Sequence, residues 1–159
     1  MTEALDLEQN SIVRKLRAWD PAAIAEVRTF RDELTLVVPR SHLRRVAELL
    51  QGDAELQFTF LSDITAVDCF PIEPRFELNY HLLSLARRER LRLKVLLSGS
   101  DPMVESVTAV WPTANWHERE AFDLFGVRFE GHPDLRRILM PEEWEGYPLR
   151  KDYPVEGFR

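Results

Sequence analysis

Two neighbouring segments of this chain alternate apolar and polar residues with a period of two, and this pattern constrains the fold most. Such alternation is typical of half-buried β-strands, because successive side chains point to opposite faces of a sheet. The charged run at residues 86–89 between them fits a hairpin turn. We therefore expect an antiparallel meander with one covered and one wetter face. The apolar positions are Phe76, Leu78, Tyr80, Leu82, Leu91, Leu93, Val95 and Leu97.

The rest of the first 110 residues completes an α+β pattern. Apolar spacing predicts a helix over 3–18, ended by Asp20-Pro21, and a second helix capped by Ser41 and stopped by Gly52. Residues 34–38 and 56–60 read as strands, while residues 22–30 fit either helix or strand. The predicted class is α+β, a mostly antiparallel sheet with helices packed on one face.

The last third of the chain has a different composition. Residues 111–159 hold 9 of the 16 aromatic residues, 5 of the 10 prolines and 4 of the 6 glycines. Asn115 and Glu118 resemble a capping box, so residues 116–125 should be helical up to Gly126. Residues 130–159 lack periodicity but carry large apolar side chains, which must rest on a core or on a partner. We expect residues 1–110 as the α+β core and 111–159 as a helix plus an extended partner-binding segment of the same domain.

Charge and composition exclude several classes of protein. The net charge of −6 is the wrong sign for binding nucleic acid. A single cysteine, Cys69, cannot form an internal disulfide or hold an iron–sulfur cluster. No apolar run approaches the roughly 18–20 residues that span a bilayer, so we expect membrane attachment only through other proteins.

The helix over 116–125 carries the residues that could do chemistry. On a helical wheel Glu118 falls within the apolar face, whereas Arg119, Glu120 and Asp123 share a charged face with Trp116. A carboxylate in an apolar face must be paired, hydrogen-bonded or protonated. Glu118 could reach back to the helix cap or pair with an arginine of this chain or of a partner, and acid–base work by Glu118, Glu120 or Asp123 is a third alternative.

No familiar catalytic or cofactor-binding motif is present. The run that starts at His117 is not H-E-x-x-H, because position 121 is Ala, and the glycine-rich phosphate loops and G-x-S-x-G are absent. We therefore expect no catalytic residue, metal or cofactor in this chain. Basic pairs at 136–137 and 150–151 lie within the apolar stretch; they form either a solvated face or, the reading we favour, anchors for a partner.

The residues over 118–125, followed by His132 and by 136–139, resemble the signature of the thirty-kilodalton subunit (the C subunit) of respiratory complex I. The likeness continues through 140–154, and upstream through 63–68, 80–85 and 109–116. It covers roughly residues 22–154. The chain ends at Arg159, whereas longer members carry an extended tail, so we expect contacts made by that tail to differ.

This resemblance implies a small α+β subunit of the peripheral arm of a proton-pumping NADH–quinone oxidoreductase. It implies that flavin and iron–sulfur clusters lie in partner subunits, and that this chain supports the subunit forming the quinone chamber. The expected location is the cytoplasmic face of the bacterial inner membrane. The residues that we expect at the partner interface are Glu118, Arg119, Glu120, Asp123, His132, Arg136, Arg137, Trp144, Arg150 and Tyr153.

Two alternatives stay open. The short chain also resembles the homologous subunit of the plastid and cyanobacterial complex, and related subunits occur in membrane-bound hydrogenases. A free-standing acid–base enzyme is a further alternative, which would be a stable monomer with a pocket at its carboxylates.

Overall fold

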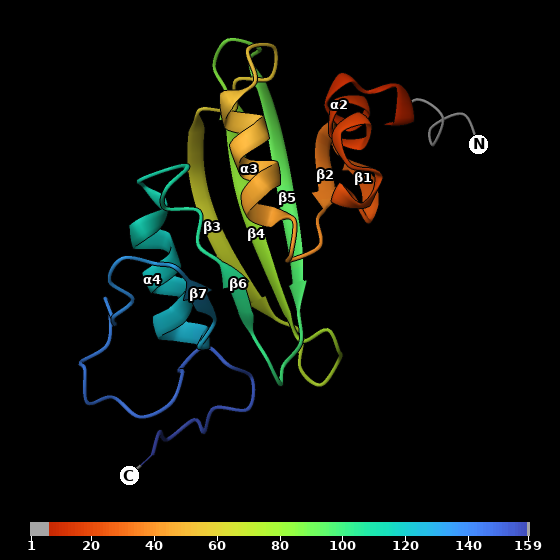
Figure 1. Cartoon of the computed structure of the whole chain (residues 1–159). Helices are drawn as coiled ribbons and strands as arrows, with labels where there is room; N and C mark the ends of the chain where they lie inside the picture. The colour runs from red at the N-terminus through yellow and green to blue at the C-terminus, as the bar shows by residue number, and fades with distance from the viewer. Residues whose placement is uncertain (1–6, 159) are drawn as a thin grey trace.

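The computed structural model describes residues 7–158, which form a five-stranded sheet with helices beside it and a long irregular segment at the C-terminal end (Figure 1). In chain order the elements are α2 (Ser11–Trp19), the short 3-10 helix η1 (Pro21–Ala23), β1 (Glu26–Phe30), β2 (Glu33–Val37), α3 (Leu43–Gly52), β3 (Phe60–Asp68), β4 (Phe76–Ser84), β5 (Glu89–Leu97), β6 (Met103–Glu105), α4 (Ala114–Phe125) and β7 (Arg128–Glu130).

The sheet has the strand order β1-β2-β5-β4-β3. Strands β4 and β5 pair antiparallel, as the alternating pattern predicts. Strand β3, which was not predicted, pairs antiparallel with β4, and β1 pairs antiparallel with β2. Strand β2 pairs parallel with β5, with Leu34 opposite Leu91. The α+β class with a mostly antiparallel sheet is confirmed, and the single parallel contact was not predicted.

The two faces of the sheet differ in character. The face toward the helices buries the apolar positions of the alternating pattern, including Tyr80 and Leu93. The opposite face carries cross-strand ion pairs, such as Lys94 with Glu77 at 2.7 Å. This division arises because the side-chain period of a strand is two.

Helices α2 and α3 cover the sheet with apolar stripes of helical spacing. Helix α2 begins after Asn10, whose Oδ1 accepts the Ile12 N–H at 2.9 Å, and it ends at Asp20 before Pro21, as predicted. Of the helix predicted over 3–18, residues 3–6 lie outside the described residues. Figure 1 shows α3 lying across the middle strands and α4 beside β3.

Two local predictions were wrong. Ser41 does not cap α3; the N-cap position is His42, and its side chain makes no capping hydrogen bond. The predicted strand over 56–60 is irregular until β3 begins at Phe60, because Gln57 has a φ of 49°, which breaks an extended strand. Leu56 and Phe58 are nevertheless fully buried, so these apolar side chains belong to the hydrophobic core although their backbone is not a strand.

A second, two-stranded parallel sheet joins β6 to β7 and frames α4. After β7 the chain continues to residue 158 without helix or strand, looping below α4 toward the lower end of the main sheet (Figure 1). Within residues 7–158, no helix is both long enough and apolar enough to span a membrane.

Candidate partner-binding surface

The irregular segment over 131–158, here called the C-terminal segment, is held in place by charged side chains that point inward. Asp123 of α4 is fully buried, and its Oδ2 accepts the backbone N–H groups of Ile138, Leu139 and Met140 at 2.7–3.0 Å. Burial alone would raise the pKa of Asp123, but these donors and Arg137 hold it below its ordinary value. Asp123 therefore fixes one turn of the segment against α4.

Arg137 extends this anchor. Its Nη1 donates to Asp123 Oδ1 at 2.6 Å, and its Nη2 donates to the carbonyl oxygens of Trp144 and Gly146 at 3.0 and 2.8 Å. Arg119 donates to the carbonyl oxygens of Arg136 and Arg137, both at 3.1 Å. The guanidinium groups of Arg119 and Arg137 thus donate hydrogen bonds to backbone carbonyl oxygens in a segment that forms neither helix nor strand.

A second anchor joins the segment to the β3–β4 hairpin. Arg75 is paired with buried Asp68, at 2.8 Å, and with Asp152, at 2.7 Å. Burial opposes ionisation of Asp68, yet hydrogen bonds from Arg75 and from the backbone N–H groups of Lys151 and Phe70 lower its pKa to about 2. The hairpin and the segment are therefore joined by a charge network whose centre, Asp68 and Arg75, is buried.

The end of α4 is built to receive an aromatic ring. Gly126 has a φ of 74° and ends the helix, as predicted. A Cβ at this position would lie 2.5 Å from Tyr147 Cε2. Arg150 lies over the same ring, 4.6 Å from its centroid, and donates to the Phe125 carbonyl oxygen at 2.6 Å. The glycine is thus required both for its backbone conformation and for the close approach of Tyr147.

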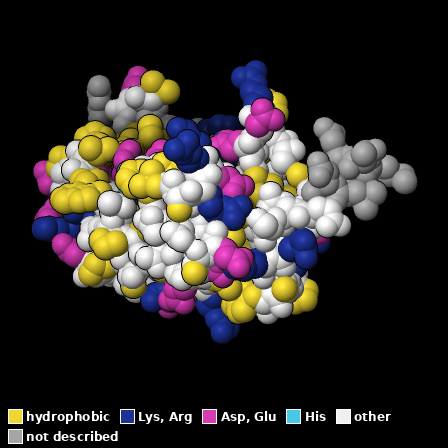
Figure 2. Space-filling model, turned by 90° about the horizontal axis from the view of Figure 1, so that it is seen from above, with side chains coloured by type: hydrophobic (Ala, Val, Ile, Leu, Met, Phe, Trp, Pro, Cys, Tyr) yellow, Lys and Arg dark blue, Asp and Glu magenta, His cyan; other side chains and the backbone are white. Residues whose placement is uncertain are grey.

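In contrast, large apolar side chains of the same region point outward. Leu139 is 61% exposed and Leu149 is 52% exposed, whereas Asp123, which accepts the Leu139 N–H, is fully buried. Figure 2 shows groups of hydrophobic side chains on the side of the molecule where α4 lies. Here charged side chains are buried and apolar side chains are exposed, the reverse of the usual arrangement. Such a reversal is typical of a preorganised binding surface. The other exposed apolar side chains here are Trp116, Trp144, Val155 and Phe158.

Glu118 occupies a separate, fully buried polar cluster. Its Oε2 accepts from Ser106 Oγ at 2.7 Å, and its Oε1 accepts from the Val107 N–H at 2.8 Å. Burial raises the pKa of Glu118 to about 7, since these two donors only partly offset the loss of water. In the described part of the chain no arginine or lysine pairs with this carboxyl group.

The capping-box interpretation of Glu118 is therefore wrong, and within residues 7–158 the expected pair with an arginine does not form. Helix α4 begins at Ala114 with Thr113 as N-cap, so Glu118 lies too far along the helix to complete a capping box with Asn115. Its nearest basic group is His132, whose Nε2 lies 4.0 Å from Oε2. Because His132 Nδ1 accepts the Asp134 N–H, its Nε2 carries the proton and donates to the Asn115 carbonyl oxygen.

The three carboxylates proposed for acid–base work do not converge. Glu118 is enclosed, Asp123 has both oxygens occupied, and Glu120 is exposed to solvent. Over the range that the structure describes, no group of three or more His, Cys, Asp or Glu residues could hold a metal ion. The three carboxylates therefore do not form a converging acid–base pair.

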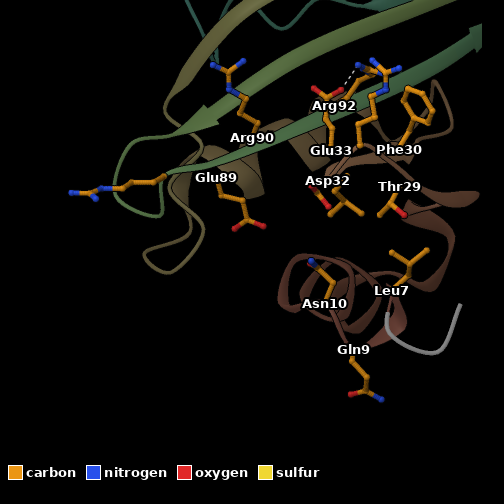
Figure 3. Close-up of a pocket in the computed structure, with 13 residues that line it drawn as sticks. Leu7, Gln9, Asn10, Thr29, Phe30, Asp32, Glu33, Glu89, Arg90 and Arg92 are labelled. Carbon is orange, nitrogen blue, oxygen red and sulfur yellow. Dashed lines mark hydrogen bonds and ion pairs between the residues drawn. The ribbon is translucent and has the colours of Figure 1, made fainter. Parts of the chain in front are cut away.

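A large hollow lies elsewhere, between the start of α2, the β1–β2 turn and β5, and has a volume of about 1240 Å³ (Figure 3). Charged side chains of both signs surround it, and Arg92 is paired with Glu33 across its edge. It contains none of the predicted interface residues.

Of those ten predicted interface residues, six make contacts within the molecule and four are exposed or half-buried. Arg119, Asp123, Arg137 and Arg150 make intramolecular contacts that position the segment, and Glu118 and His132 belong to the buried cluster. Glu120, Arg136 and Trp144 are exposed, while Tyr153 is half-buried. Asp68, Arg75 and Ser106 were not predicted, because their importance depends on contacts between residues far apart in the sequence.

The chain resembles known proteins over nearly its whole length. A family model described as "Respiratory-chain NADH dehydrogenase, 30 Kd subunit" matches residues 36–159. The C subunit of the NADH-quinone oxidoreductase of Roseiflexus sp. (strain RS-1) is 48% identical, covering 94% of this chain and 86% of that protein. The protein of the same name from Geobacter sulfurreducens is 46% identical, covering 94% and 92%.

Two solved structures are also similar. A trypsin-resistant fragment of Nqo5 (residues 1–134) has a TM-score of 0.64 at 33% identity and covers 78% of this chain and 96% of the fragment. A chain of an archaeal membrane-bound sulfane sulfur reductase has a TM-score of 0.74 at 29% identity, covering 91% and 84%.

Proposed function

The chain belongs to the family of the 30 kDa subunit of respiratory-chain NADH dehydrogenase, and from this premise we propose that it is a structural, non-catalytic subunit of the peripheral arm of an NADH–quinone oxidoreductase. In this role the C-terminal segment and α4 bind the neighbouring subunit that forms the quinone chamber. Flavin, iron–sulfur clusters and the quinone site belong to partner subunits. The chain is held at the cytoplasmic face of the membrane through the complex.

One observation carries this proposal: the C-terminal segment is rigidly anchored yet directs its apolar side chains to solvent. Asp123 and Arg137 fix its backbone from inside, while Leu139 and Leu149 stay exposed. Because intramolecular hydrogen bonds already order this surface in the free chain, little conformational entropy is lost when its apolar side chains bind a partner. A catalytic site would instead need reactive groups to converge in a pocket, and the carboxylates of α4 do not.

The experiment is purification of the native assembly. We would tag the chain at its N-terminus in its host, solubilise membranes in mild detergent and identify the co-purified proteins by mass spectrometry. We expect the other subunits of an NADH–quinone oxidoreductase in stoichiometric amounts, with NADH:quinone activity in the same fraction. A tagged chain recovered as a free monomer from active cells would refute the proposal.

The likeness to the sulfane sulfur reductase chain favours one second candidate. Its TM-score is higher than that of the Nqo5 fragment and its coverage of this chain is greater. In this alternative the same scaffold serves a respiratory membrane complex that is not an NADH–quinone oxidoreductase. The same purification separates the two, because only an NADH–quinone oxidoreductase brings down NADH-dependent activity.

A further inference from the structure

We propose that a hollow formed by Trp144, Tyr153 and Phe158 binds a cationic side chain, arginine or lysine, presented by a neighbouring subunit. This inference rests on the proposed function and names the chemistry of the partner at the same surface. The hollow has a volume of about 440 Å³ and lies in the C-terminal segment.

The aromatic rings of the hollow are positioned by close packing. Tyr153 and Phe158 meet edge to face, with centroids 5.4 Å apart and planes at 88°. Both rings lie against Gly146, where an added Cβ would be 2.7 Å from Phe158 Cε2 and 3.0 Å from Tyr153 Cε2. The Gly146 and Trp144 carbonyl oxygens are in turn held by Arg137. The floor of the hollow is therefore tied to the buried Asp123 anchor, and the site is preformed.

The rim of the hollow is acidic. Glu143, Glu145 and Glu156 line it. Among residues 7–158, none of these carboxylates takes part in an ion pair, whereas Asp68, Glu77 and Asp123 are each paired with a basic side chain. Residues 141–158 carry five acidic residues against two basic ones, Arg150 and Lys151, and Arg150 points inward to α4. The local field thus favours a cation.

Several aromatic faces in the described part of the chain are covered by arginine. Tyr147 faces Arg137 and Arg150, and Trp116 faces Arg119, with the guanidinium carbon 4.6–5.4 Å from the ring centroid. In the described residues no arginine or lysine covers the three rings of the hollow. Three aromatic side chains with an acidic rim form the kind of cage that recognises cations.

The exposure of the cage favours a side chain of another protein over a free small cation. Trp144 is 38% exposed and Phe158 is 58% exposed, so a partner that inserts an arginine or lysine also buries apolar ring surface. The cage lies in the segment that the proposed function already assigns to a partner. An arginine stem packs on aromatic surface while its head meets carboxylates, so arginine fits both features.

The test uses the intact complex purified from membranes through the tagged chain. The variant Glu143→Gln/Glu145→Gln/Glu156→Gln removes the acidic rim, and Glu26→Gln/Glu48→Gln/Glu55→Gln removes three exposed charges from β1, α3 and the loop after α3. We expect the first variant to leave the complex at lower NaCl, with an affinity about tenfold weaker. We expect the control to stay within twofold of the unchanged chain. Equal salt resistance of the two variants would overturn the inference.

A photo-crosslinking residue, p-benzoylphenylalanine, in place of Phe158 identifies the occupant. We expect a crosslinked peptide from a neighbouring subunit with an arginine or lysine beside the crosslink. A peptide without a basic residue, or binding of choline to the free chain without any crosslink, would overturn the inference. A further control combines the rim variant with Arg159→Ala. The rim variant should still weaken binding to the complex about tenfold in this background. If it no longer does, Arg159 of this chain is the cation that the cage binds, and the inference of a partner's side chain is refuted.

Failure of the proposed function gives a different result. If the unchanged chain brings down no other part of an oxidoreductase, both the function and the inference fall. If the complex is intact and only the rim variant behaves as its control, the function stands and the cation site alone is refuted.

Discussion

Replacing Glu118 by glutamine should make the folded protein more stable at alkaline pH and leave it almost unchanged at acidic pH. Glu118 is fully buried and accepts hydrogen bonds from Ser106 Oγ and the Val107 N–H. In Glu118→Gln the amide oxygen can accept from Val107, and the amide nitrogen can donate to Ser106 Oγ. The variant thus keeps the shape of the protonated acid and cannot become charged.

The magnitude follows from the pKa of the buried carboxyl group. Burial raises the pKa of Glu118 from 4.5 to about 7 in the folded protein. Between these values the folded state binds more protons than the unfolded state, so the free energy of unfolding is highest below pH 4.5 and falls as pH rises toward 7. The shift is worth about 3 kcal/mol at pH 8, where the loss is complete.

The assay is urea denaturation at pH 5, 6, 7 and 8, followed by tryptophan fluorescence. Trp111 is a core probe, because it is buried and its indole N–H donates to the Phe58 carbonyl oxygen at 3.0 Å. The difference between Glu118→Gln and the unchanged chain should grow by about 2 to 3 kcal/mol from pH 5 to pH 8. The exposed neighbour variant Glu120→Gln should show no such trend. A difference that is constant with pH would refute the reasoning.

Three further changes test the anchors of the C-terminal segment. Asp123→Asn leaves Arg137 without its buried partner and should lower the free energy of unfolding by about 3 kcal/mol, measured by urea denaturation, whereas an unchanged midpoint would contradict the anchor. Gly126→Ala places a Cβ against Tyr147 at positive φ and should lower the free energy of unfolding by about 2 kcal/mol, measured as a lower Tm. A loss of only a few tenths of a kcal/mol, as at an open surface site, would contradict this prediction. Arg75→Ala removes the ion pairs with Asp68 and Asp152 and should raise the pKa of Asp68 from about 2. Because the segment also loses its bond to the hairpin, trypsin should cleave within residues 150–153 faster at neutral pH; equal cleavage rates would contradict this.

The sequence predicted what depends on local pattern. Period-two alternation placed β4 and β5, Pro21 ended α2, and Gly126 ended α4. It missed what depends on contacts between distant segments. The parallel pairing of β2 with β5 and the irregular backbone around Gln57 have no local signal, because tertiary packing decides them.

The same limit applies to the candidate surface. Apolar and proline-rich composition predicted an extended segment over 130–159, and residues 131–158 are free of helix and strand. Composition could not tell which charges face inward. Arg137 and Arg150 were expected to anchor a partner, and in the structure they anchor the segment to α4. The direction of a long side chain is set by its final neighbours, which a single sequence does not reveal.

The central claim is that the C-terminal segment is a preformed surface that is covered by another protein of the complex. Hydroxyl-radical footprinting of the purified chain and of the intact complex measures this at single side chains. We expect Leu139, Leu149 and Phe158 to be labelled in the free chain and severalfold less in the complex, while Phe30, at the β1–β2 turn, is labelled equally in both. Equal labelling of all four residues in the two samples would contradict the claim.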